Sequence, residues 1–426
     1  LRADGRVGTR NYIALLATVN CSATVIRRAA SEIESSGLLD AYDNIDSIVA
    51  LAHGTGCGMA GDGEGYANLQ RVLWGMARHP NFAGILMVGL GCEVNQIDFL
   101  LEAYGIERGP HFQTMNIQNA GGTRKTVEWG KRMLEEMAPS VNQATRETVD
   151  ASHLSVALQC GGSDAFSGIT ANPALGAAAD LLVRAGATVM FGENTEVRDG
   201  IDQLTARAAT PQVANDLIDH LTWYDAYLAR GQVDRAANTT PGNKAGGLSN
   251  IVEKAMGSIV KSGTSPITAM IPPGERAMTP GLNYAATPAS DFVCGTLQLA
   301  AGCTLHVFTT GRGTPYSLEA MPTLKVATNS SLARRWHDLI DLDAGPIATG
   351  ETTIEEMGEA LLDLYIATAS GQPTWAERHG IHNSLALCNP APVTGVIRQA
   401  CPFAKNTTPD PPNPAKFAEI LTLSHS

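Results

Sequence analysis

The feature that most constrains the fold lies in the first third of the chain, where short apolar runs alternate with amphipathic stretches. The runs have the length of strands, and each precedes a segment whose apolar residues recur at helical spacing. They are NYIALLATV (11–19), IDSIVALA (45–52), GILMVGL (84–90) and HFQTMNIQN (111–119). Strands that alternate with helices form parallel sheets covered by helices. We therefore predict one doubly wound α/β unit over residues 1–142.

The alternation restarts after the polar segment at residues 138–152. Further strand-like runs lie at 153–159, 187–192, 266–271, 304–310 and 322–329, and an amphipathic helix lies at 353–371. We predict a second α/β unit over residues 143–388 and an irregular C-terminal tail over 389–426, where PDPPNPAK interrupts any period. The expected fold class is α/β, with two Rossmann-like units, mostly parallel sheets, and an active site between them at the carboxyl ends of the strands.

The net charge and the composition exclude some classes of binding partner for this protein. The chain has 30 Lys and Arg against 42 Asp and Glu, a net charge of −12. This balance argues against non-specific binding to nucleic acid or to an anionic membrane surface. No apolar stretch approaches the ~20 residues that span a bilayer, and the sequence opens with charged residues rather than a signal peptide. Eight cysteines over this length indicate reduced thiols, so we expect a cytoplasmic protein.

Four of the eight cysteines share one topological position. Cys21 follows the first predicted strand, Cys57 the second, Cys92 the third, and Cys160 the first strand of the second unit. In open parallel sheets, ligands bind beyond the carboxyl ends of the strands, so all four thiols are directed to that edge. Thiolates there suit soft metals or iron–sulfur clusters. Cys294, Cys303, Cys388 and Cys401 lack this placement, and we interpret them as buried packing residues.

Polar side chains follow nearly every predicted strand, which makes a binding site at this edge plausible. The candidates are Asn20, His53, Asp164, Glu193, Arg276, Arg312 and Asn329. Familiar nucleotide motifs are absent from the sequence. GTGCGMAG opens no helix at once, the first strand ends without a glycine fingerprint, and no G-x-x-x-x-G-K-[ST] occurs.

Several long motifs resemble the altronate/galactarate dehydratase family. They are DGRVGTRNY (4–12), TVNCSATV (18–25), HGTGCGM (53–59), GLGCE (89–93), QCGGSDAFSGITANPALG (159–176), PGNKAGGLSNIVEKAMGSI (241–259) and TTGRGTP (309–315). The resemblance is to the large catalytic region of the family and covers roughly residues 1–390. It implies a lyase that dehydrates a sugar acid to a 2-keto-3-deoxy acid with iron or another divalent metal. It also implies a small SAF-type domain or subunit, which has no counterpart in these residues.

The expected chemistry assigns roles to the candidates. Dehydration removes a proton α to a carboxylate and expels hydroxide, which a Lewis-acidic metal assists. Arg276 and Arg312 would stabilise the enediolate, and Asn20, Asp164 and Asn329 would help to bind the substrate. His53 is the first candidate for the general base and Glu193 the second.

Two arrangements of the metal remain open at this stage. Iron ligands would come from Cys21, Cys57, Cys92 and Cys160, as Fe²⁺ or a cluster. Alternatively, His53, Glu193 and Asp164 would hold a single Fe²⁺ or Mn²⁺. Rival functions are a sulfo-lyase of the same family that releases sulfite from sulfolactate, and a non-catalytic sugar-acid binder. We expect a homodimer, the commonest assembly.

Overall fold

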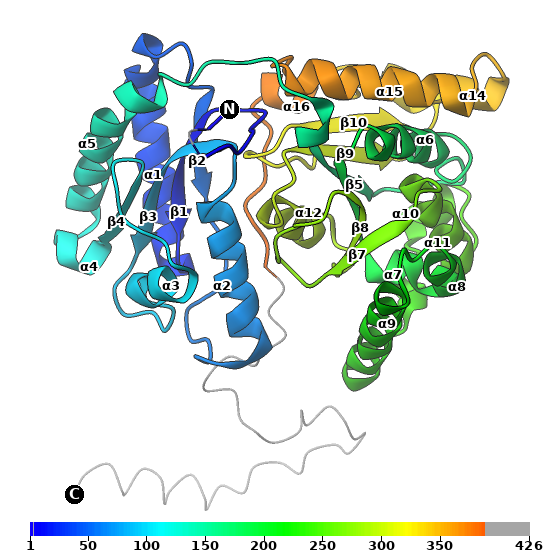
Figure 1. The fold of residues 1–426 in the computed structure, drawn as a ribbon, viewed down its shortest axis with the longest axis horizontal. Helices are drawn as coiled ribbons and strands as arrows, with labels where there is room; N and C mark the ends of the chain where they lie inside the picture. Colours follow the sequence, from blue (N-terminus) through cyan, green and yellow to red (C-terminus); the bar gives the residue numbers. More distant parts are fainter. Residues whose placement is uncertain (3, 388–426) are drawn as a thin grey trace, which may run out of the picture.

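The computed structural model describes residues 1–2 and 4–387, arranged as two α/β units side by side (Figure 1). The first unit contains a four-stranded sheet in the order β2 (Ser47–Leu51), β1 (Tyr12–Ala17), β3 (Phe82–Gly89) and β4 (Phe112–Asn116). The second contains a seven-stranded sheet in the order β11 (Leu342–Asp343), β10 (Thr323–Ala327), β9 (Leu305–Thr310), β5 (Ser155–Cys160), β6 (Thr188–Phe191), β8 (Gly281–Ala285) and β7 (Ile267–Ile271). Neighbouring strands in both sheets are parallel, which confirms the predicted fold class.

Helices cover both faces of the two sheets. In the first unit they are α1 (Asn20–Ser35), α2 (Gly63–Ala77), α3 (Ile97–Tyr104), α4 (Ile117–Ala120) and α5 (Thr123–Val141). In the second unit they are α6 (Ala171–Arg184), α7 (Asn194–Val197), α8 (Ile201–Ala206), α9 (Pro211–Gly231), α10 (Pro241–Ala245), α11 (Ile251–Ile259), α12 (Asp291–Ala300), α13 (Ser330–Arg335), α14 (Pro346–Thr349), α15 (Ile354–Ala369) and α16 (Trp375–Arg378). Within the described residues, no helix is both long and apolar enough to cross a membrane.

Strand β1 shows how the layers arise from the sequence. Its side chains alternate between two faces, and all six residues are buried. Ile13 and Leu15 belong to the core under α1 and α5, whereas Leu16 belongs to the core that contains Leu73 of α2. A strand buried on both faces reads as a continuous apolar run, which is why it was recognisable from the sequence.

The two units share one hydrophobic core. Leu73 of α2 and Leu297 of α12 lie in the same buried cluster as Leu16 of the first sheet and Phe308 of the second. At the closest approach, a Cβ on Gly75 would lie 2.2 Å from the carbonyl oxygen of Ala300, so only glycine fits there. Helices α2 and α12 thus pack together between the two sheets (Figure 1).

One strand differs from expectation, and one predicted segment cannot be compared. Strand β8 was not predicted, because its five residues follow Pro280 and show little apolar patterning. The predicted tail over residues 389–426, with Cys388 and Cys401, lies outside the described residues. Cys294 and Cys303 are buried, in agreement with the packing role expected for them. The boundaries at residues 142 and 388 stay predictions.

Candidate functional site

Three of the four strand-end thiols gather at the carboxyl edge of the first sheet. Cys21, Cys57 and Cys92 follow the adjacent strands β1, β2 and β3, and all three are exposed. The connections from β1 to β2 and from β3 to β4 run in opposite directions from the centre of this sheet. The crevice between β1 and β3 is therefore the topological switch point, where open α/β sheets bind ligands.

Glycines hold two of these thiols in tight turns. Cys57 lies between Gly56 (φ 102°) and Gly58 (φ 67°), and Cys92 follows Gly91 (φ 120°). These positive φ values are accessible to glycine at little cost. The turns project the thiols outward from strands that are otherwise buried.

Glu93 braces the turn that carries Cys92. Its carboxylate accepts hydrogen bonds from the amide of Gly91 (2.6 Å) and the amide of Leu90 (3.2 Å). It also accepts one from the Thr18 hydroxyl at the end of β1 (2.7 Å). The carboxylate therefore ties the ends of β1 and β3 together beneath the thiols.

Cys21 begins helix α1 together with Asn20, whose amide donates to the carbonyl of Thr55. Partial burial, a hydrogen bond with Cys57, and the nearby Cys92 and Glu93 raise the pKa of the Cys21 thiol. A cation bound beside the Cys21 thiol would oppose this shift, because it favours the thiolate.

His53 is close to this edge but has no free ring nitrogen. Its Nε2 donates to the carbonyl of Ala17 (2.9 Å), and its Nδ1 accepts from the amide of Thr55 (3.3 Å). Burial lowers the pKa of His53 to about 4, so the ring is neutral near pH 7. To act as a base or a metal ligand, His53 would first have to break one of these bonds.

The fourth thiol, Cys160, lies in a different centre at the carboxyl edge of the second sheet. Its Sγ is 3.1 Å from Oε2 of Glu196 and 3.3 Å from Nζ of Lys261, and its amide donates to Glu193. Lys254 pairs with Glu196 at 2.9 Å. The structure thus brings together two predicted residues, Cys160 and Glu193, and adds Glu196 and two lysines.

An amine occupies the middle of this centre. Among the described residues, Cys160, Glu193 and Glu196 are the set whose ligand atoms approach closely enough to share an ion. Lys261, however, donates to Oε2 of Glu193 (2.6 Å) and to the Ser258 hydroxyl (2.7 Å). Burial raises the pKa of Cys160 to about 12, so its thiol stays protonated. A metal would have to displace the ammonium and ionise the thiol, so this donor set fits a metal poorly.

Glu193 is held in an unusual backbone conformation. Its φ of 74° is left-handed, which is costly for a residue with a side chain. The Thr287 hydroxyl accepts its amide at 2.8 Å, and the Thr287 carbonyl accepts the amide of Asn194. Burial raises the pKa of the Glu193 carboxyl, and Lys261 opposes that shift. Such strain and such perturbed carboxyls are typical of functional sites.

A cavity of about 210 Å³ opens beside this centre. Cys160, Asp164 and Lys254 line it, together with Asn172 and Ser167. It lies where β5 meets β9, the switch point of the second sheet, because the connections from β5 to β6 and from β9 to β10 run in opposite directions. The polar side chains in its lining, among them Ser167 and Asn172, can bond a small hydroxylated ligand.

Asp164, Arg312 and Asn329 also meet at this edge. Asp164 accepts hydrogen bonds from the Thr328 hydroxyl (3.0 Å) and from Nδ2 of Asn329 (3.1 Å). A Cβ on Gly246 would touch both Asp164 and Arg312. Asp164 therefore organises the loops around the cavity, and the exposed Arg312 lies beside it.

Arg276 is not close to the other predicted site residues. The loop that carries it returns from the end of β7 to the start of β8, and Ala277 bonds the carbonyl of Ala301. Burial lowers the pKa of Arg276, and the cationic Arg6 and Arg78 lower it further. Arg6 and Arg78 precede β1 and β3, so Arg276 lies at the amino edge of the first sheet.

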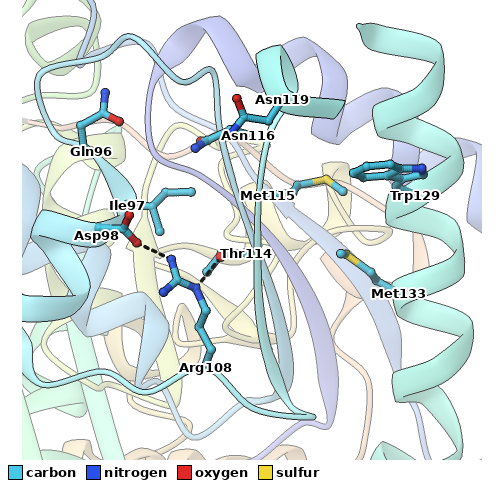
Figure 2. Close-up of a pocket in the computed structure, with 10 residues that line it drawn as sticks. All are labelled: Gln96, Ile97, Asp98, Arg108, Thr114, Met115, Asn116, Asn119, Trp129 and Met133. Atoms are coloured by element: carbon cyan, nitrogen blue, oxygen red, sulfur yellow. Dashed lines mark hydrogen bonds and ion pairs between the residues drawn. The ribbon is translucent and has the colours of Figure 1, made fainter. Parts of the chain in front are cut away.

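A second cavity, of about 340 Å³, lies next to the turn of Cys92. Figure 2 shows Asn116 and Asn119 above Arg108, which pairs with Asp98 and donates to Thr114 (2.8 Å). Gln96 lines the same cavity and bonds the carbonyl of Gly91. This amide-rich cavity thus adjoins the thiol edge.

Sequence reasoning did not identify the lysines of the second centre. Lys254, Ser258 and Lys261 are spaced i, i+4, i+7, which places them on one face at the end of α11. That spacing was readable in the motif VEKAMGSIVK. Asp291 was also missed. It begins α12, and burial, with a smaller effect from Glu196, raises its pKa to about 6.

Comparisons with known proteins agree with this architecture. The family model "D-galactarate dehydratase/Altronate hydrolase, second domain" matches residues 1–142. The model "D-galactarate/Altronate dehydratase, C-terminal" matches residues 151–393.

Alignments with individual relatives extend over most of the chain. Galactarate dehydratase (L-threo-forming) of Escherichia coli is 49% identical over 400 residues, 92% of this chain and 76% of that protein. Altronate dehydratase of Bacillus subtilis is 33% identical over 87% of this chain and 73% of its own length. The (2R)-sulfolactate sulfo-lyase subunit beta of Chromohalobacter salexigens is 30% identical over 91% of this chain and 95% of its own length. The expected enzyme class, a lyase, is confirmed, and the chain belongs to the D-galactarate/altronate dehydratase family.

Proposed function

We propose that this enzyme is a metal-dependent hydro-lyase that dehydrates a sugar acid of the galactarate or altronate type to a 2-keto-3-deoxy acid. The observation that carries the proposal is the 49% identity to a galactarate dehydratase over 92% of this chain. Galactarate is the first candidate because the altronate dehydratases are less similar, at 33%.

Iron at the thiol edge is the cofactor that the donor set supports best. Two sulfurs on one ion lie at most roughly 4.6 Å apart when each metal–sulfur bond is about 2.3 Å. Cys21, Cys57 and Cys92 do not form a group within 4.8 Å in the described structure. Their wider spacing favours an iron–sulfur cluster over a single ion. When bound, the iron would supply a Lewis acid for the departing hydroxyl group.

The cavity beside Cys160 would bind the substrate. Lys254 and Arg312 provide positive charge for a carboxylate and for the enediolate formed from it. Asp164 and Asn329 order the surrounding loops, and Asn172 and Ser167 offer hydrogen bonds to hydroxyl groups.

Of the two predicted bases, Glu193 is better placed to accept the α proton. Its carboxylate accepts a hydrogen bond from the amide of Cys160, which lines the cavity, whereas both ring nitrogens of His53 are engaged. The proton leaves the carbon α to the carboxylate, the β hydroxyl leaves as water, and the enol becomes the keto acid.

The test is to purify the protein without oxygen, determine iron and acid-labile sulfide per chain, and assay galactarate and altronate for keto-acid formation. We expect several irons with matching sulfide, and turnover of at least one substrate. Iron without sulfide would favour a mononuclear site, and no keto acid from either substrate would contradict the proposed reaction.

A sulfo-lyase activity is the second candidate. It is favoured by one observation, that this chain matches 95% of the length of the sulfolactate sulfo-lyase subunit. Sulfite release from sulfolactate, without keto-acid formation from sugar acids, would establish this alternative.

A further inference from the structure

Asn194, the residue after Glu193, is clamped by two side chains that come from elements distant in the sequence. Its Oδ1 accepts a hydrogen bond from Nε2 of His220 in α9 (2.9 Å) and another from the Tyr284 hydroxyl in β8 (2.5 Å). Asn194 is itself buried. Because an amide oxygen has two lone pairs, these two donors satisfy it fully. The side chain of Asn194 is therefore fixed from two directions.

The clamp adjoins the strained Glu193. The left-handed φ of Glu193 (74°) is followed directly by Asn194. The Thr287 hydroxyl accepts the Glu193 amide and the Thr287 carbonyl accepts the Asn194 amide, both at 2.8 Å. A residue with a side chain keeps a left-handed conformation when its surroundings hold it there. Thr287 holds the backbone of the two residues, and His220 and Tyr284 hold the Asn194 side chain.

The packing of α9 does not depend on this clamp. Val213, Leu217 and Leu221 already bury one face of the helix in the core of the second unit, from which α9 projects away from the sheet (Figure 1). Burial lowers the pKa of His220 to about 4, so its ring is neutral near pH 7 and donates through Nε2. A buried polar network adds little net stability compared with apolar packing, but it fixes the position of its members. The clamp is thus suited to positioning.

We propose that His220 and Tyr284 are positioning residues for the dehydration, which hold the Glu193 carboxylate at the edge of the second sheet by clamping Asn194. The inference rests on the proposed function, in which Glu193 accepts the α proton. From its present backbone, the Glu193 carboxylate accepts a hydrogen bond from the amide of Cys160 (3.4 Å), a residue that lines the cavity. A displacement of about 1 Å in a catalytic group lowers the rate by up to about 100-fold.

Loss of the clamp should therefore act on the chemical step. Neither His220 nor Asn194 lines the cavity, so the groups that would bind the substrate stay in place. An interaction that matters only in the transition state changes kcat, whereas one that binds substrate and transition state equally changes KM. We expect a lower kcat with a KM close to that of the wild type.

Two substitutions of His220 separate the hydrogen bond from the packing of the ring. His220→Phe keeps a ring to stack on Trp223, whose centroid is 5.6 Å away, but it has no N–H donor. His220→Gln loses the ring and keeps an N–H donor for Asn194. With galactarate or altronate as substrate, His220→Phe should lower kcat about 10- to 100-fold and change KM less than about twofold. His220→Gln should recover most of the wild-type kcat.

Tyr284→Phe tests the second donor and removes a single hydroxyl group. It should lower kcat by a similar factor, and it keeps the proposal testable if the His220 variants do not fold. The matched control is Tyr224→Phe. Tyr224 lies one turn further along α9, and its hydroxyl bonds the Thr195 hydroxyl (2.5 Å). It joins the same two helices without contacting the Asn194 oxygen, so Tyr224→Phe should keep the wild-type kcat. Thermal unfolding shows whether each variant is folded.

Three results would overturn the positioning role. They are a wild-type kcat in both His220→Phe and Tyr284→Phe, a His220→Gln variant as impaired as His220→Phe, and an equal loss of kcat in Tyr224→Phe. Failure of the proposed function gives different results. A wild type that converts neither sugar acid would contradict the reaction, and full activity of Glu193→Gln would exclude Glu193 as the base.

Discussion

Nζ of Lys261 lies 2.6 Å from Oε2 of Glu193, and both side chains are closed to solvent, at 0% and 1% exposure. Burial of both ions is tolerable because Lys261 also donates to Ser258 and Cys160. The pair holds the Glu193 carboxylate at the sheet edge, while Thr287 bonds the Glu193 amide. It also fills the space in which an ion would otherwise contact Cys160.

Removal of the ammonium should therefore destabilise the enzyme strongly. Lys261→Met leaves Glu193 buried beside Glu196 with less compensation, and we expect a loss of about 3–5 kcal/mol in the free energy of unfolding. Addition of Glu193→Gln should recover part of that loss.

Urea denaturation followed by circular dichroism measures both values. Arg28→Ala, which breaks an exposed pair with Glu32, is the control and should cost less than about 1 kcal/mol. A small effect of Lys261→Met would show that the pair contributes little.

The iron content of Cys→Ser variants should show which of the four strand-end thiols bind iron. Cys57→Ser and Cys92→Ser should lose iron, because each removes an exposed thiol that we propose as an iron ligand at the first switch point. Cys160→Ser should keep its iron, since Lys261 already neutralises that centre. Iron and sulfide analysis of the anaerobically purified variants gives the answer, and circular dichroism shows whether each is folded. Loss of iron from Cys160→Ser would restore that thiol to the ligand set.

Buried histidines should make the fold sensitive to mild acid. Burial lowers the pKa values of His53 and His79 to about 4, compared with 6.5 for a free side chain. The unfolded chain therefore binds more protons between these values, so stability is complete above pH 6.5 and is lost as the pH falls toward 4. Each histidine accounts for up to about 3 kcal/mol at the acid end of this range.

His79→Gln tests this pH dependence. A glutamine amide can still donate to the Cys303 carbonyl, which His79 bonds at 2.9 Å, but it does not titrate. Denaturation midpoints measured from pH 7 to 4 should decline less steeply in the variant. Parallel curves for variant and wild type would mean that His79 does not contribute to the acid sensitivity.

The sequence allowed prediction of features that are local along the chain. Strand runs buried on both faces are recognisable as apolar stretches, so Cys21, Cys57, Cys92 and Cys160 could all be placed at strand ends. Which thiols meet depends on the packing between sheets, which no local pattern encodes. The sequence therefore could not show that Cys160 lies beside Glu196 and Lys261.

Arg276 illustrates the same limit. A strand end was expected to bring it to the carboxyl edge, but β8 was not recognised in GLNYA, so the return of the loop to the amino edge went unseen. The pairing of Lys261 with Glu193 joins residues 68 positions apart. The helical spacing of Lys254, Ser258 and Lys261 was the one sequence feature that indicated this pairing.

Gly161 should tolerate no side chain. A Cβ there would lie 2.7 Å from Oδ1 of Asp291 and 2.5 Å from the Phe308 ring. Neither neighbour can retreat easily, because Phe308 is part of the shared core and Asp291 begins α12. Gly161→Ala should therefore cost about 1–3 kcal/mol in stability and displace the Asp291 carboxyl from the edge beside Cys160. Gly109→Ala is the matched control, since a Cβ at Gly109 meets no atom within 4 Å. Thermal unfolding compares the two variants. Equal midpoints would mean that the sheet edge can relax around the added methyl group. In that case, glycine at residue 161 is not needed to keep Asp291 in position.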